Sequence, residues 1–183
     1  MLETLRDALK TQEMRKKILF TLMMFLIFRI GSHIPVPGID KTQIAALIEQ
    51  IKLLGFFDTI SGSALKNVSI FAMSITPYIN ASIIIQLLTV IFPRLEAIAK
   101  DDRKKIVEYT RYLTVGLGFI QALGMAFYFR NSGAMADASV MSMIIVILSL
   151  TAGTACLMWI GELITEKGIG NGISLIIFAG IVS

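Results

Sequence analysis

Long stretches without a charged residue are the feature that most constrains this chain. They approach or exceed the roughly 20 residues that an α-helix needs to cross a bilayer. The charge-free stretches are residues 67–93, 112–129, 138–161 and 168–183. A further apolar run, Ile18 to Ile34, contains Arg29 near its end, where a guanidinium can reach the headgroups. Since 55% of the residues are apolar and 16% charged, we predict an all-α polytopic membrane helix bundle with five candidate spans.

The Lys and Arg residues between these runs alternate in number from one connection to the next. The richer connections hold Arg6, Lys10, Arg15, Lys16 and Lys17, then Arg94, Lys100, Arg103, Lys104, Lys105 and Arg111, then Lys167; the poorer ones hold Lys41, Lys52, Lys66 and Arg130. This bias predicts a cytoplasmic amino terminus. The net charge of +4 fits topology and anionic lipid rather than nucleic acid, because no basic stretch is interleaved with aromatics.

Residues 1–17 form the first of two predicted regions. Apolar and basic side chains separate roughly on opposite sides of a helix there, which predicts a cytoplasmic amphipathic segment before a membrane domain spanning residues 18–183. The first apolar run lacks a small-x-small cleavage site after it, so we predict a retained helix rather than a signal peptide. Pro35 and Pro37 should end that helix.

The second candidate span contains a proline and several polar residues. Pro77 in its interior removes one backbone hydrogen bond, so a bend is expected. Asn80 and Gln86 at membrane depth are costly unless they meet polar partners or water. They could hydrogen-bond neighbouring helices or line a hydrated path, and the sequence alone favours neither.

Residues 53–65 are apolar and aromatic but interrupted by glycines, serines and Asp58. The stretch is too short to span, so it is a candidate for a re-entrant or interfacial helix. Its composition alone favours an amphipathic helix on the outer leaflet.

Residues 161–173 predict a tight glycine-rich turn in which Asn171 caps the next helix. Only twelve residues follow from Gly172, about 18 Å of helix, too little to cross alone.

The sequence offers no pattern for catalysis, a metal or a cofactor. No P-loop occurs, the apolar runs lack Asp, Glu and His apart from His33 at a boundary, and Cys156 is the single cysteine. We therefore expect no enzyme activity.

Four motifs carry a family resemblance. They are Phe28–Gly31 with Ile34–Asp40, Ile75–Leu88, Tyr109–Tyr112, and Gly161–Ser174. Their order and spacing are similar to those of the bacterial SecY (SecY/Sec61-alpha) family, from about residue 15 to the chain's end. The resemblance implies a channel of two pseudo-symmetric five-helix halves. This chain would supply helices 1 to 4 and the start of helix 5 of the amino-terminal half, with the carboxy-terminal half missing.

The resemblance also implies three sets of functional residues. The pore ring would include Ile75, Ile79, Ile173 and Ile177. The plug, about residues 55–66, would include Gly55, Phe56, Phe57, Ile60, Gly62 and Leu65, which reverses the preference for an interfacial helix. This half's side of the lateral gate would include Pro77, Asn80 and Gln86.

The function implied by the resemblance is a passive protein-conducting channel in the bacterial inner membrane. It would translocate secretory polypeptides and release membrane segments laterally into lipid. The implied partners are SecE, SecG, the SecA motor or a ribosome, and the nascent polypeptide. The alternatives are half of a small-solute transporter with discontinuous helices and a purely structural membrane scaffold.

Overall fold

The structure of the protein, a computed structural model, describes residues 11–40, 42, 44, 64–135, 137 and 139–182. Within these ranges the regular structure is helical, and the β-type pairing consists of the isolated bridges Pro35–Ser69 and Ile39–Met135. The helices are α2 (Gln12–Gly31), α5 (Thr76–Ile91), α6 (Pro93–Asp101), α7 (Arg103–Asn131), α8 (Val140–Lys167) and α9 (Gly172–Val182). The predicted all-α class is confirmed.

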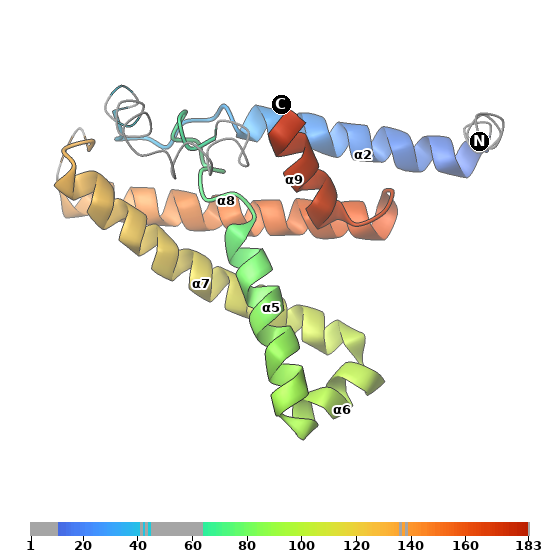
Figure 1. Ribbon diagram of the computed structural model, residues 1–183. Helices are drawn as coiled ribbons and strands as arrows, with labels where there is room; N and C mark the ends of the chain where they lie inside the picture. The colour runs from blue at the N-terminus through green and yellow to red at the C-terminus, as the bar shows by residue number, and fades with distance from the viewer. Residues whose placement is uncertain are drawn as a thin grey trace.

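Helices α2, α8 and α9 form one side of the molecule. Figure 1 shows α2 alongside α8, with the short helix α9 folded back against both from the carboxyl end of α8. The helix α2 begins at Gln12, inside the predicted segment 1–17, and ends at Gly31, so the expected stop before Pro35 and Pro37 is confirmed. The described part of helix α9 has 11 residues.

Two helices of the described residues are long and apolar enough to cross a membrane by themselves, α7 and α8. They pack together and α5 packs on α7 (Figure 1). The pair α5 and α6 meets the same criterion only as one span broken by a 111° bend. The helix α2 does not meet it, since Arg15, Lys16, Lys17 and Arg29 lie within its 20 residues.

The stretch after α5 is helical, formed by α6 and the beginning of α7. Pro93 begins α6 and Asp102 caps α7 by accepting a hydrogen bond from the Lys104 N–H. In the exposed helix α6, Lys100 donates to Glu96 at 2.6 Å, and this bond holds the pKa of the Glu96 carboxyl below its ordinary value. A proline at a helix start costs no hydrogen bond, which explains why the chain bends and restarts here.

The prediction that Pro77 bends the second span from its interior is wrong. Residues 64–75 form non-helical turns, and α5 begins at Thr76 with Pro77 in its first turn, where the missing N–H needs no partner. Val68 and Ser74 have positive φ angles of 46° and 54°, so this segment turns through the left-handed region. Its backbone pairs with the loop that follows α2, where the Val36 N–H donates to the Val68 carbonyl at 2.8 Å.

Two hydrophobic clusters hold these elements together. One lies around α7 and the first half of α8 and includes Phe129, Val146 and Leu150. The other joins α2, residues 64–75, the second half of α8 and α9, and its fully buried side chains include Leu157, Ile164 and Ile176. The second cluster contains the candidate site.

Candidate functional site

The four isoleucines named for the pore ring belong to one apolar cluster, and we call them the aliphatic site. Ile75 is 2% exposed, and Ile79, Ile173 and Ile177 are partly buried against the same core. Ile75 precedes α5, and its carbonyl accepts from the Ile79 N–H at 3.1 Å. This first helical turn explains how residues four apart lie near one another. The structure therefore brings together residues from the start of α5 and from α9.

Paired glycines allow α9 to approach α8 at this site. A Cβ atom on Gly172 would overlap the Gly161 carbonyl oxygen. A Cβ atom on Gly161 would lie 2.7 Å from Cδ1 of Ile173 and 3.6 Å from Cδ1 of Ile75. Because Gly161 has no side chain, the Cδ1 atoms of Ile75 and Ile173 can both lie close to its Cα.

A hollow of about 340 Å³ opens beside the aliphatic site. Its lining combines Ile79 and Ile173 with Ser82 and Gln86 of α5 and with Asn171 of the turn before α9. The Gln86 side chain donates to Ser82 Oγ of its own helix at 3.1 Å, and within the described residues it reaches no other helix. Both interpretations of these polar residues, a hydrated path and interhelical hydrogen bonding, stay predictions.

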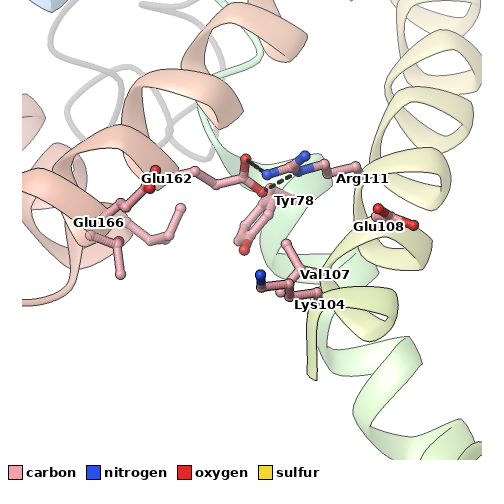
Figure 2. Close-up of a pocket in the computed structure, with 9 residues that line it drawn as sticks. Tyr78, Lys104, Val107, Glu108, Arg111, Glu162 and Glu166 are labelled. Carbon is pink, nitrogen blue, oxygen red and sulfur yellow. Dashed lines mark hydrogen bonds and ion pairs between the residues drawn. The ribbon is translucent and has the colours of Figure 1, made fainter. Parts of the chain in front are cut away.

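A larger pocket of about 520 Å³ lies where α5, α7, α8 and α9 meet (Figure 2). Across it Arg111 of α7 pairs with Glu162 of α8 through two contacts, Nε to Oε1 at 2.9 Å and Nη2 to Oε2 at 2.8 Å. Tyr78 of α5 lies beside the pair, and Glu108 and Glu166 are on the pocket's rim (Figure 2). The two-point geometry links α7 to α8 in one relative orientation, through a pair that is partly exposed. The sequence analysis did not find this pair, because its partners are 51 residues apart.

The turn from α8 to α9 is held by side chains. Asn171 Oδ1 accepts from the N–H groups of Ile173 at 3.0 Å and Ser174 at 3.4 Å, so the predicted cap is confirmed. Gly170 has a φ of +67°, the conformation that glycine adopts without strain. Two threonine hydroxyls, those of Thr21 and Thr165, also accept from the turn, and the sequence analysis missed both.

The residues predicted for the lateral gate do not share one environment. Pro77 is buried at the start of α5, whereas Asn80 and Gln86 are exposed further along that helix.

Of the predicted plug, Gly55, Phe56, Phe57, Ile60 and Gly62 lie outside the described residues. Leu65 is buried in the α7–α8 cluster rather than with the aliphatic site. Both assignments stay predictions.

No group of three or more His, Cys, Asp and Glu residues gathers in the described ranges, so they present no candidate metal ligands. The site joins an apolar cluster to a hollow whose lining is partly polar and partly apolar.

Comparison with known proteins identifies the family to which the chain belongs. The family model described as SecY matches residues 69–183, which include the whole aliphatic site. The chain belongs to the SecY family. Curated SecY relatives align along the entire chain: "Protein translocase subunit SecY" of Halalkalibacterium halodurans is 48% identical, with 44% of its length covered, and that of Bacillus subtilis is 48% identical with 44% covered. The chain thus spans about half the length of the curated SecY proteins it matches.

Solved structures show the same SecY-like fold. "Sec61 in the Canine ribosome-channel complex from the endoplasmic reticulum" superposes with a TM-score of 0.64 at 23% identity, over 92% of this chain and 36% of that one. "The structure of a protein conducting channel" matches with the same values. The described helices are therefore those of a SecY-family membrane protein, and the predicted resemblance is confirmed.

Proposed function

We propose that this chain forms one half of the central subunit of a protein-conducting channel. The channel translocates secretory polypeptides across the membrane and releases apolar segments sideways into lipid. The observation that carries the proposal is the convergence of Ile75 and Ile173 over Gly161, next to a hollow lined by Ser82 and Gln86. An aliphatic constriction beside a polar surface resists water and ions at rest, yet deforms around a passing chain.

In this proposal the aliphatic site is part of the pore ring, and residues 55–66 form the plug on its outer side. The exposed polar side of α5, together with α7, forms this half's edge of the lateral gate. An apolar segment of roughly 20 residues gains about 0.3–0.6 kcal/mol per central Leu, Ile, Phe or Val on entering lipid. That free energy drives release without a catalytic step.

The partners belong to the proposal as well. The missing carboxy-terminal half completes the ring, SecE and SecG accompany it, and the SecA motor or a ribosome drives the polypeptide from the cytoplasmic side. The distribution of Lys and Arg supports a cytoplasmic amino terminus in the bacterial inner membrane. The residues 1–17 would then be the cytoplasmic segment, and residues 18–183 the membrane domain.

The test is reconstitution of the completed subunit with its partners into vesicles. The proposal expects a secretory precursor to become protease-protected when a motor and ATP are supplied, with no saturable uptake of small solutes. Solute uptake without precursor protection would instead support the half-transporter. Neither activity from properly folded vesicles would support a structural scaffold.

A further inference from the structure

Two threonines from different helices hold the turn between α8 and α9. The Thr165 hydroxyl donates to the Gly161 carbonyl at 2.9 Å and accepts from the Gly172 N–H at 2.8 Å. The Thr21 hydroxyl donates to the Lys17 carbonyl at 2.9 Å and accepts from the Ile169 N–H at 3.3 Å. Each hydroxyl therefore connects its own helix to the backbone of the turn.

The second hydrogen bond distinguishes these threonines from others in the helices. Thr110, Thr151 and Thr154 each donate to the carbonyl four residues earlier, the usual bond of a helical threonine. Their hydroxyls accept no hydrogen bond from the described residues. Thr21 and Thr165 thus accept a hydrogen bond from a backbone N–H because both lie next to the turn between α8 and α9.

The bonds satisfy the open N–H groups at the start of α9 and one N–H of the turn before it, that of Ile169. The Gly172 N–H has Thr165, the Ile169 N–H has Thr21, and the next two donors have Asn171. Gly172 is buried, so water is poorly placed to replace the threonine. Side chains from α2 and α8 therefore hold the turn and the first residue of α9. They set where α9 begins along its axis and how it is rotated about that axis.

The register of α9 matters because the next residues belong to the aliphatic site. One residue of slippage would rotate every α9 side chain by about 100° around the helix axis. Ile173 would then leave its place over Gly161, beside Ile75, and Ile177 would turn with it. Thr165 itself is among the residues that line both pockets next to the site.

We infer that Thr165 and Thr21 are positioning residues that set the register of α9 and thereby hold Ile173 and Ile177 in the pore ring. The inference rests on the proposed function for the meaning of the ring, while the register itself is a structural quantity. It makes the tightness of the closed pore depend on two hydroxyl groups that do not themselves line the ring.

The experiment compares variants of the completed subunit, assembled with its partners in membranes. Thr165→Val removes the hydroxyl at constant shape, Thr165→Ser keeps it, and Thr151→Val removes a hydroxyl from the same helix that has no second bond. The first readout is amide hydrogen exchange of residues 169–175. The second is the ion conductance of the resting channel.

We expect Thr165→Val to speed exchange by about fivefold, the effect of losing one ordinary hydrogen bond, and to raise resting conductance. Thr165→Ser and Thr151→Val should match the parent in both readouts. Should Thr165→Val fail to assemble, Thr21→Val gives the same comparison at the Ile169 amide.

Unchanged exchange in Thr165→Val would overturn the inference, even if the parent translocates normally. Faster exchange with unchanged conductance would also overturn it, because the register would then not control the pore. Failure of the parent to translocate would count against the proposed function instead. The two failures are therefore distinguishable.

Discussion

The backbone of Ile70 packs against Gly153 of α8 so closely that a Cβ atom on Gly153 would overlap the Ile70 carbonyl oxygen. The non-helical segment 64–75 therefore crosses α8 at a glycine. A second glycine, Gly31 at the end of α2, makes room in the same way for the ring of Phe71. These contacts fix the segment that leads into α5 and hence the position of Ile75.

Gly153→Ala should destabilise the protein, because neither the Ile70 backbone nor α8 can move without disturbing the buried cluster. We expect a loss of about 1–3 kcal/mol, typical of overpacking. The control is Gly124→Ala on α7, since a Cβ atom there would meet nothing within 4 Å. Thermal unfolding of the completed protein in detergent measures both, and equal stability of the two variants would contradict the close contact.

The Arg111–Glu162 pair should couple α7 to α8 measurably but modestly. The Arg111 side chain is 49% exposed, so solvent screens the pair, and a double-mutant cycle with Arg111→Met and Glu162→Gln should give about 0.5–1 kcal/mol. High salt should reduce it. The more exposed pair of Lys100 and Glu96 serves as control and should couple less; a coupling at Arg111 no larger than this would contradict the assigned geometry.

Local sequence signals predicted much of the helical architecture. The end of α2 before Pro35 and the Asn171 cap follow from proline and cap chemistry within a few residues. The aliphatic site came from the family resemblance, since an isoleucine in an apolar run is ordinarily lipid-facing or packed. The four-residue spacing alone could not select these positions from the many other isoleucines.

The features that the sequence analysis missed depend on distant contacts. Hydropathy extended the second span back through residues 67–75, because these residues are uncharged and mostly apolar. Their apolar side chains are instead buried around α2 and α8. The bond from the Ile169 N–H to Thr21 joins residues 148 apart. No local pattern distinguishes such a threonine from one that bonds only within its own helix.

Polar substitution in the aliphatic site should open a leak. Ile75→Asn combined with Ile79→Asn should raise the resting ion conductance of the completed channel in planar bilayers, because polar groups lower the cost of holding water in a constriction. Ile79→Asn alone should give a smaller increase while sparing the buried Ile75. The control Ile91→Asn, at the exposed end of α5, should not leak. Conductance equal to the parent in both site variants would remove these residues from the ring.

The plug prediction is tested with paired cysteines at positions 60 and 75 in a Cys156→Ala background. Efficient disulfide formation in the resting channel that is lost while a polypeptide occupies the pore is the expected result. Equal bonding in both states would indicate fixed packing. Absence of bonding in either state would support an interfacial helix at residues 55–66.

The central claim is that a translocating polypeptide passes the aliphatic site. The most direct measurement is cysteine crosslinking of a stalled secretory chain in the completed channel, again without Cys156. Positions 79 and 173 should form adducts, whereas position 148, where Leu148 is 59% exposed on α8, should form none. An arrested chain that crosslinks to neither 79 nor 173, although translocation of the same chain is demonstrated in parallel, would contradict the account.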